Sequence, residues 1–494
     1  MTKLDELRRE LDVIDDKIAA LFARRMDIGR AVGLYKKHSE YPVNDPGRET
    51  AIIKRIADEL PPLSKEFAPA LMQTLFSCSK AVQKRVSGNY YVIGKKLPHS
   101  WSPEIYTPLG LDYGIKELPD EEAVKRFVSA REFNGINVTI PYKQTVIPLL
   151  DYVSDEAREV GAVNTIVNRD GKLYGYNTDV GGMTAAIAAA GINPKGMTAA
   201  VFGGNGGTAH TARYVLKTLG ARQILTVSRT GDINYNNVYD YPVEFIINAT
   251  PVGMYPRIES SPADPARFPS LKGVFDAVYN PLRTVFVEEA LASGIPAANG
   301  LYMLVEQGRL AYQLFTGTEV DKSVTQTITD SIAAAKTNIV LTGMPGAGKT
   351  SVGRELSAIT GREFIDLDDE IERAEGRTIP EIFAADGEDY FRAAESRAVA
   401  DASAKNGVII ATGGGAVMSN ANRLALKRNG YIVYIKRDIK DLPSDGRPVS
   451  RQRGAEAIYN ERKGVYESFA DLTIENVDIL STAQTIATAD YKRI

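Results

Sequence analysis

The sequence predicts a multidomain chain, with an all-helical segment followed by two separate α/β regions. Three observations support this prediction. Residues 1–86 contain only three of the chain's 42 glycines and are typical of long helices. Short β-branched runs such as "YYVIG" and "EFIINAT" then alternate with helical stretches, which predicts parallel sheets. The alternation starts afresh at "TNIVLTGMPGAGKT", so we expect domains at 1–88, 89–335 and 337–494.

Composition excludes several classes of protein. The 494 residues suffice for about three domains, and a net charge of −3 gives no basic field for nucleic acid. One cysteine precludes an internal disulfide, and three histidines disfavour a His/Cys metal centre. The charged start "MTKLDELRRE" is no signal peptide, and no apolar run approaches the roughly 18 residues that span a bilayer. We therefore expect a cytoplasmic protein without nucleic-acid or membrane partners.

The first region is predicted to form three helices, at about 2–38, from Asp45 onward, and from a cap at Ser64 to about 86. A helix of about 37 residues is unusually long and is expected to pack against a partner chain. Arg25 and Ser79 interrupt apolar stripes. Burying an unpaired guanidinium is costly, so Arg25 should face an anion, either an interhelical carboxylate or a ligand. The first helix's stripe comprises Leu4, Leu7, Leu11, Ile14, Ile18, Leu21, Ile28 and Val32.

The middle region contains a glycine turn between a strand and a helix, in "AAVFGGNGGTAHTARYVL". Gly204, Gly206 and Gly207 allow a pyrophosphate to sit at the helix N-terminus. The next strand ends in Ser228, Arg229 and Thr230, where an acidic residue would bind the ribose of NAD. This composition favours a Rossmann-type domain that binds NADP(H), at about 191–294.

The flanking parts, about 89–190 and 295–335, carry polar residues for a substrate. In "NGINVTIPYK", Asn137, Thr139 and Lys143 can line a pocket at a strand end. Lys143 with Asp179 can shuttle the proton that accompanies hydride transfer to a ketone.

The third region opens with "GMPGAGKT", a phosphate-binding loop between a strand and a helix. Its ATP-binding candidates are Gly343, Gly346, Gly348, Lys349, Thr350 and Ser351. Asp366 and Asp368 lie two apart on an expected strand and so face the same way. Asp366 can join Thr350 in holding Mg²⁺, while Asp368 accepts from a substrate hydroxyl.

This third region resembles shikimate kinase in its phosphate loop, D-x-D, F-R, GGG, R-P lid and N-E-R. The resemblance implies that Lys349 and the lid residue Arg447 stabilise the transferring phosphoryl group. It also implies a shikimate site made of Asp368, Arg392, Gly413, Gly414, Gly415 and Arg462. The lid "DLPSDGRPVS" is shorter than usual and lacks an arginine expected upstream of Arg447, which leaves another small polyol open as substrate.

The middle region resembles shikimate dehydrogenase over nearly all of 89–335. Lys143 and Asp179 match the catalytic pair, and Asn248 and Thr250 match a cofactor-side loop. The implied substrate residues are Ser100, Ser102, Asn137, Thr139, Lys143, Asn164, Asp179, Tyr279 and Gln307. His210 replaces a usual Arg or Lys of the glycine turn, and Trp101 reads as a packed loop aromatic. The alternative is a quinate dehydrogenase that uses NAD.

The first region resembles all-helical chorismate mutase, an intertwined dimer. The resemblance implies that Lys36 and Gln83 meet the ether oxygen of chorismate, and that Arg25 and Arg48 hold its carboxylates. Arg8 would come from the partner subunit. The full set of matching positions is Arg8, Arg25, Lys36, Asp45, Arg48, Glu49, Ser79 and Gln83.

Together the resemblances imply a trifunctional enzyme of aromatic amino-acid biosynthesis. It would rearrange chorismate to prephenate, reduce 3-dehydroshikimate with NADPH, and phosphorylate shikimate with ATP and Mg²⁺. The alternative is a bifunctional dehydrogenase–kinase whose N-terminal helices form only a dimerisation or ligand-sensing module.

Overall fold

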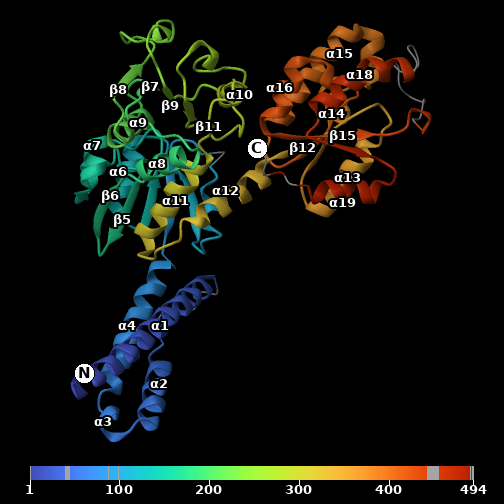
Figure 1. Ribbon diagram of the computed structural model, residues 1–494. Helices are drawn as coiled ribbons and strands as arrows, with labels where there is room; N and C mark the ends of the chain where they lie inside the picture. Colours follow the sequence, from blue (N-terminus) through green and yellow to red (C-terminus); the bar gives the residue numbers. More distant parts are fainter. Residues whose placement is uncertain are drawn as a thin grey trace. The chain divides into compact units, whose positions relative to one another are not determined.

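The computed structural model describes residues 2–38, 45–86, 88–97, 100–441, 455–489 and 491 (Figure 1). The chain divides into two compact units. One comprises Met1–Gly181 and Glu306–Lys322, and the other Gly182–Val305 and Ser323–Ile494. No described helix is long and apolar enough to cross a membrane.

The first unit begins with the three expected helices, α1 (Lys3–His38), α2 (Pro46–Glu59) and α4 (Ala68–Val86). A short helix that was not predicted, α3 (Pro62–Lys65), lies between α2 and α4. The predicted cap of α2 is confirmed, because the Asp45 side chain accepts from the backbone N–H of Arg48 at 3.0 Å. The cap predicted at Ser64 is wrong: Ser64 lies inside α3, and α4 begins four residues later.

A six-stranded sheet follows in the same unit, in the order β2-β1-β3-β5-β6-β4. Its strands are β1 (Tyr90–Gly94), β2 (Tyr113–Glu117), β3 (Gly135–Val138), β4 (Tyr152–Val153), β5 (Thr165–Arg169) and β6 (Lys172–Tyr176). The predicted parallel arrangement is wrong for β5, which runs antiparallel to both β3 and β6. Asp170 and Gly171, at φ 52° and 83°, form a two-residue turn between β5 and β6, so these strands are a hairpin.

Both faces of this sheet are covered. On one face, Ile93, Ile136 and Ile166 pack in a buried cluster with Val124 and Val128 of α6. On the other, Tyr90 contacts Phe315 of α11 with ring centroids 5.3 Å apart. The helices around this sheet are α5 (Ser102–Tyr106), α6 (Glu121–Ala130), α7 (Asp155–Val160), the start of α8 (Asp179–Ala189) and the end of α11 (Leu301–Thr316).

The second unit contains a five-stranded parallel sheet in the order β11-β10-β9-β7-β8. Its elements are β7 (Thr198–Phe202), α9 (Gly207–Thr218), β8 (Gln223–Val227), β9 (Phe245–Asn248), β10 (Gly273–Asp276), α10 (Val285–Ala292) and β11 (Ala297–Ala298). The strand order reverses between β7 and β9, and ligands of such sheets bind outside the carboxyl ends of the strands at this switch point. The glycine turn follows β7, so the fold places it where a dinucleotide is expected.

The same unit contains a second parallel sheet, in the order β13-β14-β12-β15-β16. Its strands are β12 (Asn338–Thr342), β13 (Phe364–Asp366), β14 (Ile409–Ala411), β15 (Gly430–Lys436) and β16 (Leu472–Glu475). Its helices, after α12 (Ser323–Lys336), are α13 (Lys349–Thr360), α14 (Leu367–Glu375), α15 (Ile379–Ser403), α16 (Asn420–Asn429), α18 (Ala455–Phe469) and α19 (Ile479–Ala487).

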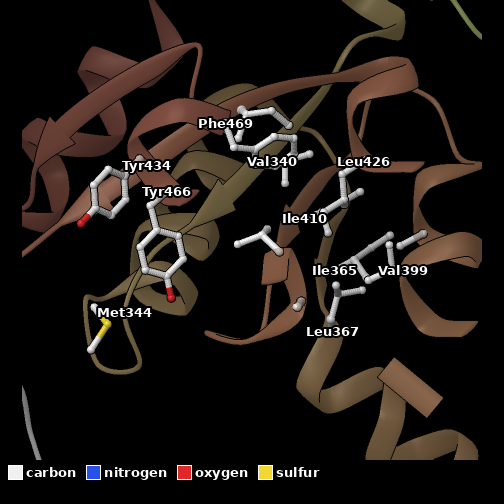
Figure 2. Close-up of a cluster of buried hydrophobic side chains, with 14 of the residues drawn as sticks. Val340, Met344, Ile365, Leu367, Val399, Ile410, Leu426, Tyr434, Tyr466 and Phe469 are labelled. Atoms are coloured by element: carbon white, nitrogen blue, oxygen red, sulfur yellow. The ribbon is translucent and has the colours of Figure 1, made fainter. Parts of the chain in front are cut away.

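Alternating residues of the central strands bury both faces of this sheet. Val340 and Ile410 pack with Tyr466 and Phe469 of α18 (Figure 2). Their neighbours, such as Ile339, point to the other face and pack with α13 and α19. In Figure 1, α13 and α19 lie on one side of β12 and β15, and α15, α16 and α18 on the other. A parallel sheet covered on both faces explains why these strands are almost wholly apolar.

Candidate active sites

The phosphate-binding loop folds around its own lysine. Lys349, the first residue of α13, is 8% exposed, and its Nζ donates to the carbonyl oxygens of Gly343 and Met344 at 3.0 Å each. The loop joins β12 to the N-terminus of α13, where free backbone N–H groups and the helix dipole attract phosphate. The next residue, Thr350, donates from Oγ1 to Asp366 Oδ2 at 2.6 Å. These two oxygens are therefore placed together, as a shared Mg²⁺ site requires.

The two aspartates of the D-x-D motif do not lie on one strand, which corrects the prediction. β13 ends at Asp366, whose Oδ1 caps α14 by accepting from the N–H of Asp368 at 3.1 Å. Asp368 lies in the first turn of α14. Burial, reinforced by the charge of Asp366, raises the pKa of Asp368 to about 6. Both side chains still reach one cavity, because a helix start directly after a strand keeps them at the same sheet edge.

The glycine triplet at 413–415, after β14, lies against side chains from several other elements of this site. A Cβ on Gly413 would lie 3.0 Å from Asp368 Oδ1, and one on Gly415 would lie 2.5 Å from Arg392 Nη1. Polar side chains thus touch the loop backbone, and a larger residue would displace them. The Tyr466 hydroxyl donates to the Gly414 carbonyl and holds the loop in place.

Two arginines complete the cavity, which has a volume of about 600 Å³. Arg392 pairs with Glu395 at 2.8 Å and with Glu388 at 3.0 Å. Glu395 is 2% exposed, and burial raises its pKa while the charge of Arg392 opposes the shift. Arg462 is 5% exposed, and its Nε has no hydrogen-bond partner within the described part of the chain. A buried donor left open in this way fits an anionic ligand.

Lys143 and Asp179, whose contact the sequence could not show, form an ion pair in the first unit. The distance from Lys143 Nζ to Asp179 Oδ2 is 2.5 Å, and the side chains are 16% and 11% exposed. Lys143 lies in the turn after β3, and Asp179 is the first residue of α8. A lysine ammonium held against a carboxylate can donate a proton to a substrate and then be reprotonated.

Asn164 and Gln307 are also brought together. Asn164 Nδ2 donates to Thr178 Oγ1 at 3.1 Å and to Gln307 Oε1 at 3.5 Å, and its Oδ1 accepts from the N–H of Thr178 at 2.7 Å. Ser100 and Ser102 are joined by their hydroxyls at 3.2 Å. Trp101 between them is 3% exposed, which agrees with its interpretation as a packed aromatic.

Asn137 has a structural partner at every polar position of its amide. Its Oδ1 accepts from the hydroxyls of Tyr106 and Tyr113 at 2.7 and 2.6 Å. Its Nδ2 donates to Asn164 O at 3.3 Å and to Thr165 Oγ1 at 3.0 Å. The two tyrosine rings are stacked with centroids 4.0 Å apart. In this arrangement Asn137 supports the pocket wall and offers no further donor or acceptor.

The glycine turn after β7 matches the needs of a dinucleotide. Gly204 has φ +55°, and a Cβ there would lie 3.3 Å from Ser228 Cβ at the end of β8. The turn is therefore packed directly beside the strand end that carries Ser228 and Arg229. Gly206 precedes α9 and Gly207 begins it, so the helix N-terminus opens at this turn.

The buried carboxylate of Asp276 supports the predicted cofactor-side loop through hydrogen bonds. Asn248 Oδ1 accepts from the hydroxyl of Thr250 at 2.6 Å, and Asn248 Nδ2 donates to Asp276 Oδ1 at 2.9 Å. Thr284 also donates to Asp276, at 2.7 Å. Burial raises the pKa of Asp276 to about 6, against these hydrogen bonds. Tyr279, the remaining predicted substrate residue, follows β10 in this second unit.

In the helical region, α1 and α4 approach closely around Arg25. Arg25 Nη1 donates to the Leu75 carbonyl at 2.6 Å, and its guanidinium lies 5.6 Å from the Phe76 ring centre. It forms no ion pair within the described ranges, so the interhelical carboxylate that was an open alternative is absent there. A Cβ on Gly29 would lie 2.8 Å from Ser79 Oγ, which places Ser79 between the helices.

The other predicted mutase residues have diverse environments. Ser79 and Gln83 are both 8% exposed and one turn apart on α4. Glu49 pairs with Lys80 at 3.2 Å, which ties α2 to α4. Arg8 and Arg48 are exposed, and Lys36 is half-buried near the end of α1.

Comparison with known proteins identifies each region. The family "Shikimate dehydrogenase substrate binding domain" matches residues 92–166, and "Shikimate 5'-dehydrogenase C-terminal domain" matches 300–326. A Clostridium perfringens protein named shikimate dehydrogenase (NADP(+)) is 36% identical over 263 residues, or 49% of this chain and 97% of that protein. The chain belongs to the shikimate dehydrogenase family. A similarly named Caldicellulosiruptor bescii protein is 36% identical over 246 residues, or 44% and 85% of the two chains.

The shikimate dehydrogenase region is joined to domains of two other families. "Chorismate mutase type II" matches residues 7–84, and "Shikimate kinase" matches 345–489. A solved chorismate mutase/shikimate 5-dehydrogenase fusion protein from Clostridium acetobutylicum is 32% identical, covers 49% of this chain and 96% of its own, and has a TM-score of 0.46. The family matches and the curated relatives confirm the three resemblances found in the sequence.

Several site residues were missed from the sequence of this shikimate dehydrogenase family member. Glu395, Asp276, Tyr106 and Tyr113 act on predicted residues through hydrogen bonds that only the fold reveals. Glu395 had a weak signal, since it lies one helical turn after Arg392 of the F-R motif, in "YFRAAE" at residues 390–395. The lid residue Arg447 lies outside the described residues.

Proposed function

We propose that the chain is a trifunctional enzyme that converts chorismate to prephenate, reduces 3-dehydroshikimate to shikimate with NADPH, and phosphorylates shikimate with ATP. The observation that supports it most strongly is that three independent residue sets, one in each family domain, carry the chemistry of these reactions. Two of the reactions are consecutive, since the product of the reductase is the substrate of the kinase. We place the domains at 1–88, 89–335 and 337–494, in a cytoplasmic protein.

In the dehydrogenase reaction, bound NADPH supplies the hydride. Lys143 then protonates the oxygen of the reduced ketone, and Asp179, 2.5 Å away, holds the ammonium in position. Asn164 and Gln307, already hydrogen-bonded to each other, are suited to orient the ring hydroxyls of the substrate. Ser100 and Ser102 are suited to its carboxylate, with Thr139 and Tyr279 as further contacts.

In the kinase reaction, bound MgATP supplies the phosphoryl group, with Thr350 and Asp366 as the residues that would hold Mg²⁺. Phosphate oxygens and water would complete the shell, because Mg²⁺ is usually bound through one or two protein oxygen ligands together with substrate phosphates. Asp368 accepts the hydrogen of the attacking hydroxyl. Arg392 and Arg462 bind the shikimate carboxylate, for which the open Nε of Arg462 provides a donor.

The mutase reaction requires a rigid dianion and positive charge beside the breaking ether bond. Arg25 and Arg48 are proposed to bind the two carboxylates, and Lys36 and Gln83 to meet the ether oxygen. Arg8 is exposed and near the start of α1, so we assign it to the site of a partner subunit. This assignment requires a homodimer through the N-terminal helices.

A three-activity assay on purified full-length chain tests the proposal. Arg25→Ala, Lys143→Ala and Lys349→Ala should each abolish one activity and leave the other two. A folded wild type without prephenate formation would reduce the helices to a dimerisation or sensing module. Rates with NADPH against NADH, shikimate against quinate, and shikimate against other polyols decide the remaining alternatives.

A further inference from the structure

Arg213 is an unneutralised arginine in the proposed cofactor domain. It lies half-buried in α9, seven residues into the helix. Its Nη1 donates to the Gly204 carbonyl at 2.7 Å. This hydrogen bond uses one of the five N–H donors of the guanidinium. No carboxylate pairs with it within the described part of the chain, and burial lowers the pKa of Arg213. A charge left half-buried without a counter-ion calls for an external anion.

The helix dipole of α9 disfavours a guanidinium at this position. Arg213 folds back past the start of α9 to reach Gly204, three residues before the helix begins. Cations are destabilised near a helix N-terminus, because the helix dipole is positive there. An anion bound at this turn would reverse that penalty.

The position of the glycine turn indicates which anion Arg213 would bind. Gly204 is the residue of the turn that packs against Ser228, with a Cβ position 3.3 Å from Ser228 Cβ. Ser228 and Arg229 end β8, the strand whose end faces the ribose in this fold. Arg213 is therefore hydrogen-bonded to the residue of the turn that packs against the end of β8. His210 lies one helical turn earlier on the same face, in the position that lacks the expected Arg or Lys.

We propose that Arg213 binds the 2′-phosphate of NADP(H) and, together with Arg229, makes the domain select NADPH over NADH. This inference rests on the proposed NADPH dependence. It explains how the chain retains a basic group at the glycine turn although His210 has replaced the usual one. The contact with Gly204 holds the guanidinium in place before the cofactor arrives.

The test is direct binding of NADPH and of NADH to the full-length chain, by fluorescence titration at several ionic strengths. Arg213→Gln should weaken NADPH binding by about 10- to 100-fold, as for loss of a hydrogen bond to a charged group, and flatten its salt dependence. NADH binding should change by less than about twofold. Arg213→Lys should restore part of the NADPH affinity, because it keeps the charge and loses the fork.

Arg222→Gln is the matched control, because Arg222 pairs with Glu244 at 3.2 Å just before the start of β8, at the opposite end of that strand from Ser228. It should leave both affinities unchanged. Equal losses of NADPH and NADH affinity in Arg213→Gln would mean a structural or pyrophosphate role and would overturn the inference. Unchanged NADPH affinity in that variant would overturn it too. A wild type without preference for NADPH would overturn both the inference and the proposed cofactor, whereas preference retained by Arg213→Gln would refute the inference alone.

Discussion

The apolar stripe of α1 predicts that one substitution will separate the mutase from the other two activities. The stripe residues from Leu4 to Val32 expose between 38% and 66% of their surface in the single chain. So many half-exposed leucines and isoleucines on one helix are typical of an interface. Leu21, at 66%, is the most exposed of them and lies one turn from Arg25. Leu21→Glu is therefore expected to break the proposed dimer at the mutase site.

The magnitude follows from the exposed surface. Full burial of a leucine contributes about 1.5–3 kcal/mol, so burial of the remaining two thirds of Leu21 contributes about 1–2 kcal/mol. A symmetric dimer contains two copies, and each glutamate must also lose its hydration on association. The total is on the order of 5 kcal/mol per dimer, which raises the dimer Kd by between three and four powers of ten.

Sedimentation velocity and the three activities, measured on the same samples, provide the assay. Leu21→Glu should sediment as a monomer, lose prephenate formation, and retain the dehydrogenase and kinase rates. Leu291→Glu is the control, because Leu291 is 56% exposed on α10 and belongs to the other compact unit. A monomeric wild type with full mutase activity, or a dimeric and active Leu21→Glu, would refute the reasoning.

Three further expectations concern the α/β domains. Lys143→Met should lower the dehydrogenase kcat by about 10²–10⁴-fold without weakening NADPH binding, and a matching loss of affinity would argue for a different role. Glu395 holds Arg392 in position, so Glu395→Gln should raise the kinase KM for shikimate by about tenfold or more and leave the ATP affinity unchanged. A KM equal to that of the wild type would exclude this positioning role of Glu395. Burial raises the pKa of Asp276 from about 4 in the unfolded chain to about 6 in the folded protein. Its contribution to the free energy of unfolding is therefore present below about pH 4 and is lost as the pH rises through about 6, a decrease of about 3 kcal/mol. Asp276→Asn should flatten the unfolding free energy of the NADP domain over that window, and an unchanged pH profile would trace it to other groups.

Short local patterns in the sequence predicted much of the fold and of the candidate sites. The phosphate loop and the NADP turn are strand–glycine–helix units, in which spacing alone dictates the backbone path. The hairpin of β5 and β6 was missed although its Asp170-Gly171 dipeptide is a strong turn signal, because the α/β alternation around it favoured parallel strands. Asp366 and Asp368 were correctly assigned to one site on a wrong premise, since the chain turns into a helix between them.

Long-range contacts could not be predicted from the sequence. The saturation of the Asn137 amide depends on Tyr106 and Tyr113, which lie 31 and 24 residues away. They meet it only because α5 packs against β2, which is separated from β3 by β1 alone in the sheet. The support of Asn248 by Asp276 similarly depends on the pairing of β9 with β10. Such contacts decide which polar residues bind a ligand and which hold others in place, and they follow from tertiary packing.

The arginines show how this distinction can be drawn. Arg309 is 4% exposed and pairs with Glu306 at 2.7 Å, as a structural arginine must to offset its burial. Arg25, Arg213 and Arg462 form no ion pair within the described residues; the first two donate to a carbonyl, and the third keeps Nε open. Each lies in a different domain, and each domain acts on an anion. Removing Arg309 should therefore destabilise the fold by about 3–5 kcal/mol, whereas removing any of the other three should cost ligand affinity and leave stability unchanged or raised. In the sequence these four arginines look alike, and the carboxylate partner that the fold gives to Arg309 separates it from the other three.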